Sequence, residues 1–357
     1  MDDKKLLDIY TDYLISSFGS TTGTGLSRLL DGAISHDRIQ RFLSSPTRTG
    51  KDLWKVVKPY VRRIQSEEGV LIVDDSIAEK PYTDENNMIA WHYDHTQGRS
   101  VKGINFITAL YQVDAISLPV NYHLIQKTDY YTDPQTDDLK RRSPVTKNEV
   151  YRQLVRQVVR NKVPFRYVLN DTWFASVDNM KLVKTELKRD FIMPVKTNRK
   201  IALSLAAKKQ GQYVRVDTLT LEPDTCLTIY LEGLDFPLLL VKQIFTNADG
   251  SVGILHLVTS DIDLTYDSIT TIYGKRWNVE LYHKSLKQNA SLAKSPTKTV
   301  TTQSNHFYAA LCAFIKLEML KCATQTNHFA LKSKLYLGAL RTAFNSLHQM
   351  KPISFSA

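Results

Sequence analysis

The sequence contains little cysteine. Its 357 residues include only Cys226, Cys312 and Cys322, an odd number of thiols that lie far apart along the chain. None belongs to a C-x2-C motif, and no histidines cluster beside them. Disulfide scaffolds and structural zinc sites need such pairs or clusters, so both classes are excluded. We expect a protein that works in a reducing compartment.

Long apolar runs are also missing. No stretch approaches the roughly 18 uncharged apolar residues that a membrane span requires. The first residues, MDDKKLLDIYTDYL, are acidic and amphipathic, whereas a secretory leader is basic and then apolar. We therefore expect a cytoplasmic protein with no membrane partner.

Acidic residues are outnumbered by basic ones. Lys and Arg number 47 against 36 Asp and Glu, which gives a net charge of +11 and an isoelectric point near 9.3. Such a balance favours a polyanionic partner, with nucleic acid as the first class to consider. A ribosome-associated or membrane-surface protein would share it, so charge indicates a class of partner and no chemistry. The length predicts two or three domains.

Four polar residues share one stripe in the stretch 267–290, DSITTIYGKRWNVELYHKSLKQNA, which we predict to be a single helix. Tyr273, Arg276, Glu280 and Lys287 are spaced by three, four and seven residues. At about 100° per residue they fall within roughly 60° of one another. A solvated helix face is the alternative, but a glycine in the first turns and a tryptophan directly after the arginine do not suit one.

This stretch resembles the Y-x2-R-x3-E-x6-K motif of the insertion-sequence DDE transposases that work by cut and paste. The resemblance implies a ribonuclease H-like domain whose third catalytic acid is Glu280. It also implies that Tyr273, Arg276 and Lys287 contact DNA near the cleaved end, with Trp277 beside a displaced base.

An apolar run, VLIVDDSI, predicts a buried strand from Gly69 that ends at two aspartates. A hairpin pattern with a turn near Asp114 follows it, VKGINFITALYQVDAISLPVNYHLI. A strand-to-loop transition with a solvated aspartate pair is the alternative interpretation. The resemblance identifies Asp75 as the first catalytic acid, and Asp74 is its competitor for that role.

A second strand that ends in aspartate follows a predicted helix. Thr146 and Glu149 form a capping box at the start of that helix, and the next strand, PFRYVLND, ends in Asp171. The string around Asp171 resembles the D-x-W-F string at the second acid of the same family. Asp171 could instead cap a helix over 176–188.

The remaining segments complete an α/β fold. We predict a fifth strand at DFIMPVKTN, then an all-β insertion with strands at YVRVDTLTLE, CLTIYLEG, FPLLLVKQIFT and VGILHLVTS. The family resemblance implies a β-rich insertion here that helps hold the transposon end. Residues 126–142 are predicted to form an aperiodic loop.

Helices flank this core at both ends of the chain. Two short helices about Gly32, with Ser35 as an N-cap, could form a helix-turn-helix that presents Arg38, Gln40 and Arg41 to DNA, or could simply pack. Pro59 should kink the next helix. The predicted regions are a helical, DNA-binding 1–66, a ribonuclease H-like mixed sheet flanked by helices at 67–198 and 263–325, the insertion at 199–262, and a C-terminal helix at 326–357 that could contact a second protomer.

Three carboxylates on two strand ends and a helix suit two Mg²⁺ or Mn²⁺ ions, which prefer oxygen ligands. We predict that Asp75, Asp171 and Glu280 hold both metals, and we leave the nearby His92, Asp94 and His95 out of the site. The expected function is a DNA transposase that hydrolyses phosphodiester bonds at transposon ends and transfers strands into double-stranded target DNA, as a homodimer assembled on DNA. A ribonuclease H-like nuclease without strand transfer, or an inactive transposase-derived DNA-binding protein, is the alternative.

Overall fold

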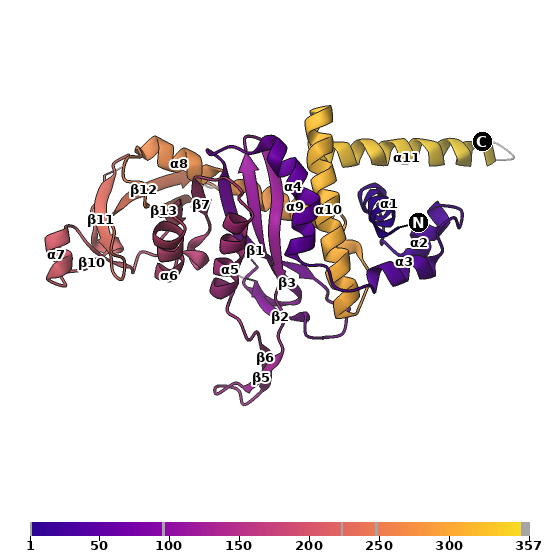
Figure 1. The fold of residues 1–357 in the computed structure, drawn as a ribbon. Coiled ribbons are helices and arrows are strands. Elements are labelled where there is room, and N and C mark those ends of the chain that lie inside the picture. Colours follow the sequence, from indigo (N-terminus) through magenta and orange to yellow (C-terminus); the bar gives the residue numbers. More distant parts are fainter. Residues whose placement is uncertain (1, 95–96, 223, 247–248, 351–357) are drawn as a thin grey trace. The chain divides into compact units, whose positions relative to one another are not determined.

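The structure is a computed structural model that describes residues 2–94, 97–222, 224–246 and 249–350 (Figure 1). Contacts divide the chain into two compact units. The first, here called the helical unit, contains residues 1–56, 78–104 and 282–357. The second, the sheet unit, contains residues 57–77 and 105–281. His95, one of the histidines left out of the predicted metal site, lies outside the described residues.

One mixed sheet organises the sheet unit. Its strands run in the order β4-β3-β1-β7-β8-β13-β12-β11-β9-β10. β1 pairs in parallel with β7, and β7 with β8, whereas β3 and β4 form an antiparallel hairpin. The bounds are β1 Val70–Glu79, β3 Arg99–Val113, β4 Ile116–Leu124, β7 Tyr167–Leu169, β8 Asp190–Pro194, β9 Lys200–Ala202, β10 Val214–Arg215, β11 Leu227–Leu231, β12 Leu238–Thr246 and β13 Val252–Thr259.

The predicted hairpin is confirmed. Asp114 connects β3 to β4 with a φ of 49°, a left-handed conformation that aspartate tolerates better than most residues. The first strand is buried on both faces from Val70 to Val73, as its continuous apolar run predicts. The mixed α/β class expected from the sequence is therefore correct.

Helix α5 (Lys147–Arg160) lies along this sheet (Figure 1). The predicted capping box is present, with Thr146 and Glu149 satisfying each other's backbone N–H groups. The apolar face of the helix is buried at Val150, Leu154, Val155 and Val158. The helix predicted over 176–188 is present as α6 (Val177–Lys181), which continues as a π-helix over Leu182–Glu186.

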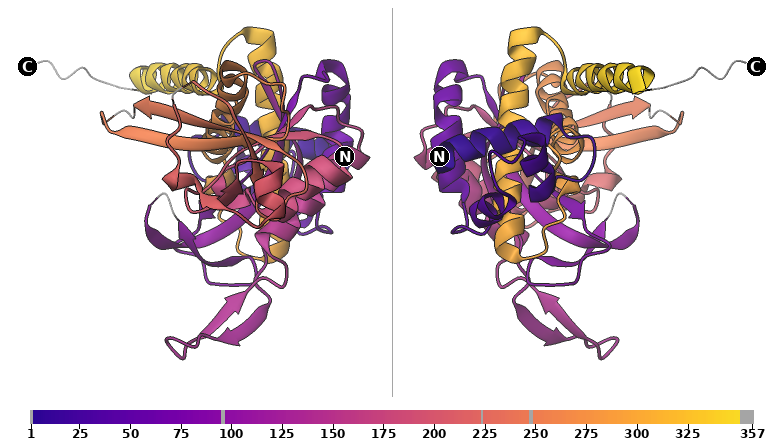
Figure 2. Two further views of the ribbon diagram at one scale, coloured as in Figure 1. Left: turned by 90° about the vertical axis from the view of Figure 1, so that its left-hand side faces the viewer. Right: turned by 90° about the vertical axis from the view of Figure 1, so that its right-hand side faces the viewer.

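The predicted insertion extends the same sheet. Strand β13 pairs antiparallel with β8, and β12 pairs with β13 along a long ribbon (Figure 2). The insertion is not all β, because it contains helix α7 (Leu205–Lys209). The strand predicted at YVRVDTLTLE is also mostly absent. Only Val214 and Arg215 pair as β10, and the chain then turns through a 3₁₀ segment where Arg215 bonds to Asp217.

The loop predicted over 126–142 is a β-hairpin. Strands β5 (Asp129–Thr132) and β6 (Leu139–Arg142) pair antiparallel and project from the sheet unit (Figures 1 and 2). The guanidinium groups of Arg141 and Arg142 lie over the rings of Tyr130 and Tyr131 across the pair, at 5.7 and 5.5 Å. Cation–π contacts stabilise this hairpin in place of buried apolar residues, which is why hydrophobic periodicity did not reveal it.

The helical unit combines helices from both ends of the chain with residues 78–104. Its helices are α1 Asp3–Ser16, α2 Gly23–Leu29, α3 His36–Leu43, the start of α4 Gly50–Ile64, the end of α9 Trp277–Gln288, α10 Val300–Thr324 and α11 His328–Met350, and strand β2 (Ile89–Asp94) pairs with the first half of β3. Ser35 caps α3, as predicted. Pro59 lies inside α4, and the kink predicted there stays a prediction.

The three cysteines are free thiols. No helix within the described ranges combines the length and apolar character needed to cross a membrane. The first unit's long helix α10 is buried along most of its length, as its apolar composition predicts.

Candidate active site

The two aspartates lie inside strand β1 and do not end it. The prediction that the strand stops there was wrong, because β1 continues to Glu79 beside the long strand β3. On its other side, pairing with β7 covers only Val70 to Ile72. Beyond that point β1 runs past the end of β7, so the side chains of Asp74 and Asp75 emerge where the parallel neighbour has stopped.

Asp74 is the more buried member of the pair. Its side chain is 11% exposed, and its Oδ1 accepts a hydrogen bond from the backbone N–H of Asp75 at 2.9 Å. Burial raises the pKa of the Asp74 carboxyl well above its usual range, and the nearby charges of Asp171 and Asp75 raise it further. Arg276 opposes this shift, with its Nη1 at 3.9 Å from Oδ2 of Asp74.

Asp75 is held by two residues that sequence reasoning missed. Its Oδ2 accepts from Nζ of Lys147 at 2.6 Å and from Nδ2 of Asn105 at 3.0 Å. Lys147 is the first residue of α5, and Asn105 is fully buried on β3. Lys147 and Asn105 lie 72 and 30 positions from Asp75 along the chain, so no short motif links them to it. Only the fold brings the three side chains together.

Asp171 follows β7 and caps a short 3₁₀ helix over Thr172–Phe174. Its Oδ1 accepts from the backbone N–H groups of Trp173 and Phe174, at 3.1 and 3.3 Å. Burial raises the pKa of the Asp171 carboxyl, and the charge of Asp75 adds to the shift. The cap considered from the sequence, on a helix over 176–188, is wrong, because Ser176 caps that helix and Asp171 caps the 3₁₀ helix before it. Asp171 also lies near the β1 carboxylates, whose charges it feels.

The single helix predicted over 267–290 is wrong. The structure has α8 (Tyr266–Gly274) and then α9, with a tightened turn between them. There the N–H groups of Lys275 and Arg276 bond to carbonyls three residues back, at 3.1 and 2.9 Å, instead of four. Gly274 precedes the turn and is a weak helix former. Tyr273 and Glu280 therefore belong to different helices.

Arg276 is the cation at the centre of this group. Its Nη1 lies 3.4 Å from Oε1 of Glu280 as well as near Asp74, and its side chain is 17% exposed. The guanidinium also lies over the rings of Tyr273 and Trp277, at 5.9 and 5.4 Å from their centres. Helical spacing predicted that Arg276 lies beside Glu280, but nothing in the sequence predicted its ion pair with Asp74 on β1.

The other residues predicted to contact DNA differ in how far they are exposed to solvent. Tyr273 is buried, and its hydroxyl donates to the carbonyl of Asn170 at 3.4 Å. Trp277 is 68% exposed, so its indole is open to a ligand. Lys287 is half-buried in the part of α9 that belongs to the helical unit. Contact of all three with DNA stays a prediction.

The donor types fit a divalent cation, whereas the observed spacing is wider than one ion requires. Asp74, Asp75, Asp171 and Glu280 supply oxygens that suit Mg²⁺ or Mn²⁺. Burial and, after it, repulsion between carboxylates raise the pKa values of Asp74 and Asp171, and a bound cation would relieve that repulsion. Within the described ranges, no three such side chains lie close enough to share one metal ion. Side-chain movement, including release of Asp75 by Lys147, would be needed to bring them together.

The raised pKa of Asp74 predicts a pH-dependent cost to folding. The pKa of this carboxyl is higher in the folded protein than in the unfolded chain, where it is about 3.9. Its contribution therefore destabilises the folded state increasingly as the pH rises through the pKa of the folded state. Asp74→Asn keeps the Oδ1 acceptor and removes the charge. We expect the variant to be more stable at pH 7 by about 1 kcal/mol, with a flatter dependence of stability on pH above 4. Urea denaturation across that range measures this, and equal pH profiles for the two proteins would contradict it.

The two family models that match this chain both describe DDE enzymes. Residues 1–213 match the model described as DDE superfamily endonuclease, and residues 143–315 match the one described as transposase DDE domain. No protein of curated function matches the sequence. Among solved structures, the chain is similar to the Drosophila P element transposase strand transfer complex at 16% identity and a TM-score of 0.28. That match covers 53% of this chain and only 37% of the other, and a TM-score this low does not establish a shared fold.

Proposed function

Since this chain belongs to the DDE superfamily of endonucleases, we propose that it is a DNA transposase that cleaves double-stranded DNA at transposon ends and joins the freed strand to target DNA. The match of residues 143–315 to a transposase DDE domain supports this activity. The observation that supports it is that carboxylates from three distant segments, namely β1, the end of β7 and α9, all interact with Arg276.

We propose that the carboxylates bind two divalent metal ions. Enzymes of this superfamily use divalent metals, and here Asp75, Asp171 and Glu280 would bind Mg²⁺ or Mn²⁺. When bound, such ions lower the pKa of an attacking water and stabilise charge on the leaving oxygen. We retain Asp75 as the first acid, with Asp74, which is more buried and lies beside Arg276, as its competitor for the role.

Lys147 competes with a metal ion for Asp75. Its ammonium group occupies one carboxylate oxygen at 2.6 Å, so any cation that binds there must displace it or tolerate its charge. Lys147→Gln is therefore expected to raise the Mn²⁺ affinity of the DNA-free protein by about three- to tenfold, as titration calorimetry would measure.

The sheet unit offers a matched control for this variant. Lys184 forms an equally short pair with Asp190, at 2.6 Å, away from the β1 carboxylates. Lys184→Gln makes the same charge change and should leave Mn²⁺ affinity unchanged. If both variants bind Mn²⁺ as the unmodified protein does, Lys147 has no influence on the site.

DNA and a second copy of the chain are the proposed partners. Trp277 and Lys287 would contact the strand near the cleaved end, and the basic side chains of α3 remain a second proposed contact. In the helical unit, α11 exposes an apolar row with heptad spacing: Leu337, Leu340, Phe344 and Leu347. This row suits a homodimer assembled on DNA. A cytoplasmic location stays a prediction.

An assay with transposon-end DNA and a separate target duplex tests the function. The expected products are a strand nicked at the end and, later, a strand joined to the target. Cleavage without any joined product would favour a ribonuclease H-like nuclease, and binding without cleavage at any divalent metal would favour an inactive transposase-derived protein.

A further inference from the structure

Two cations lie among the carboxylates of the sheet unit, and they are held in different ways. Nη1 of Arg276 lies near both Asp74 and Glu280, at 3.9 and 3.4 Å. The same guanidinium group lies over two aromatic rings. Contacts on several sides hold this cation in place, because moving it would break ion pairs and cation–π contacts together.

The second cation, Lys147, has a fixed backbone and a movable side chain. It is the first residue of α5, where the capping box of Thr146 and Glu149 fixes the start of the helix. Its side chain is 30% exposed and reaches Asp75 through a flexible stem, with 2.6 Å between Nζ and Oδ2. Rotation of that stem can move the ammonium group while the helix stays in place.

Asp75 has a second donor that keeps its orientation if Lys147 leaves. Nδ2 of Asn105 donates to the same carboxylate oxygen at 3.0 Å, and Asn105 is fully buried on β3. A divalent ion bound to Asp75 would repel the nearby ammonium group, since both are positive. Lys147 would then need another anion, and the phosphate of a bound DNA strand is the anion that the proposed reaction brings to this site.

We propose that Lys147 has two successive anionic partners: Asp75 in the free protein, and the phosphate to be cleaved once Asp75 binds a divalent ion. In the first state the ammonium group neutralises a carboxylate that would otherwise repel DNA. In the second it adds a point charge where negative charge develops on the phosphate. The inference rests on the proposed function for the identity of the phosphate, and it adds a substrate contact to the competition of Lys147 with a metal ion.

This exchange of partners makes metal binding and DNA binding depend on each other. Lys147 opposes metal binding in the free protein, but a bound phosphate would take up its charge and remove that opposition. DNA should therefore raise the affinity for a divalent ion, and the ion should raise the affinity for DNA by the same factor.

The charge of one phosphate is the variable in the test. End duplexes carry either a normal phosphate or a neutral methylphosphonate at the cleavage point, and fluorescence anisotropy gives their affinities for the unmodified protein and for Lys147→Gln. The four affinities form a double-mutant cycle that isolates the interaction of Lys147 with that phosphate. The cycle is measured without metal and with Ca²⁺, and gel electrophoresis after each titration verifies that the DNA is uncleaved.

The coupling between Lys147 and the phosphate should appear only with the ion. Without metal it should stay below about twofold, because the ammonium group is held by Asp75. With Ca²⁺ it should rise to about tenfold or more, as for a hydrogen bond to a charged group. Lys147→Arg keeps the positive charge and should retain most of this coupling.

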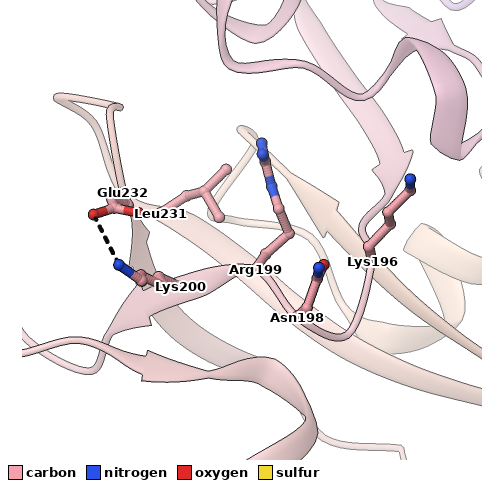
Figure 3. A pocket seen from close by; sticks show the side chains of 6 residues that line it. All are labelled: Lys196, Asn198, Arg199, Lys200, Leu231 and Glu232. Carbon is pink, nitrogen blue, oxygen red and sulfur yellow. Dashed lines mark ion pairs between the residues drawn. The ribbon is translucent and has the colours of Figure 1, made fainter. Parts of the chain in front are cut away.

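Lys200→Gln is the matched control, because it also removes the lysine of a lysine–carboxylate pair. In Figure 3 the side chain of Lys200, on β9, points toward Glu232, with 3.8 Å between Nζ and Oε1. This variant should show no coupling to the same phosphate in either condition. The melting temperature of each variant checks that the fold is intact.

Two results would overturn the inference. Absence of coupling in Ca²⁺ would mean that Lys147 does not reach the phosphate, and equal coupling with and without Ca²⁺ would mean that it does not exchange partners. Cleavage and joining by the unmodified protein in Mg²⁺, measured alongside, test the proposed function separately. If both reactions occur while either result is found, the transposase function stands and only the role given to Lys147 is wrong.

Discussion

Asp171→Asn is expected to lower the rate of metal-dependent strand cleavage by about a thousandfold or more. Charge stabilisation by a bound metal is worth several kcal/mol in the transition state, and each 1.36 kcal/mol is a factor of ten in rate. Removing one carboxylate charge weakens metal binding while leaving phosphate contacts in place. End-DNA binding should therefore stay close to that of the unmodified protein.

Asparagine separates the chemical role of Asp171 from its structural role. The side-chain Oδ1 that accepts from Trp173 and Phe174 is retained in Asn, so the 3₁₀ turn after β7 should persist. Asp171→Ala loses that cap as well, at a cost of about 1 kcal/mol of folding stability. If Asp171→Asn cleaves normally and only the alanine variant is impaired, the residue is a cap and the assignment of the second acid is wrong.

Exposed Asp178, in the first turn of α6, offers a matched control. Asp178→Asn makes the same change of charge a few residues away and should leave cleavage unchanged. Parallel assays of Asp75→Asn and Glu280→Gln should show losses as large as that of Asp171→Asn. Normal cleavage by Asp75→Asn with loss in Asp74→Asn would show that Asp74 is the first acid.

Local sequence patterns predicted the strands and turns on which the site is built. The run before Asp74 is apolar at every position, which is a direct consequence of burial on both faces of β1. The turn at Asp114 and the cap at Thr146 are also encoded within a few residues of chain. Elements of this kind depend on short-range chemistry, so they can be predicted without knowing the fold.

The connections inside the site could not be predicted in that way. Lys147 reaches Asp75 only because α5 lies along the sheet, and the bridge from Arg276 to Asp74 joins segments about two hundred residues apart. Helical spacing alone favoured one continuous helix at 267–290. The change from four- to three-residue hydrogen bonds at Lys275 leaves the periodicity almost intact, so the break could not be seen in the pattern.

Arg276→Gln is expected to destabilise the fold by about 2–4 kcal/mol at pH 7.5. Removing one partner of a buried ion pair leaves an uncompensated charge, which typically costs about 3–5 kcal/mol. The loss should lie toward the lower end because Glu280 is 50% exposed and is stabilised by water. The cost should shrink toward pH 5, since the already raised pKa of Asp74 rises further in the variant and proton uptake then replaces the missing cation.

Lys287→Gln provides the comparison, because it removes a cation from α9, the helix that follows Arg276, and leaves the ion pairs of Asp74 and Glu280 in place. It should destabilise the fold less than Arg276→Gln does and lower the salt dependence of end-DNA binding by about one unit of slope. Arg276→Gln should show the reverse pattern, with a large change in stability, measured by urea denaturation, that Mg²⁺ partly reverses because a bound ion stabilises the ionised carboxylates. If Arg276→Gln instead unfolds at the same urea concentration as the unmodified protein and loses one unit of slope, Arg276 is a phosphate contact, and its ion pairs in the free protein contribute little to the fold.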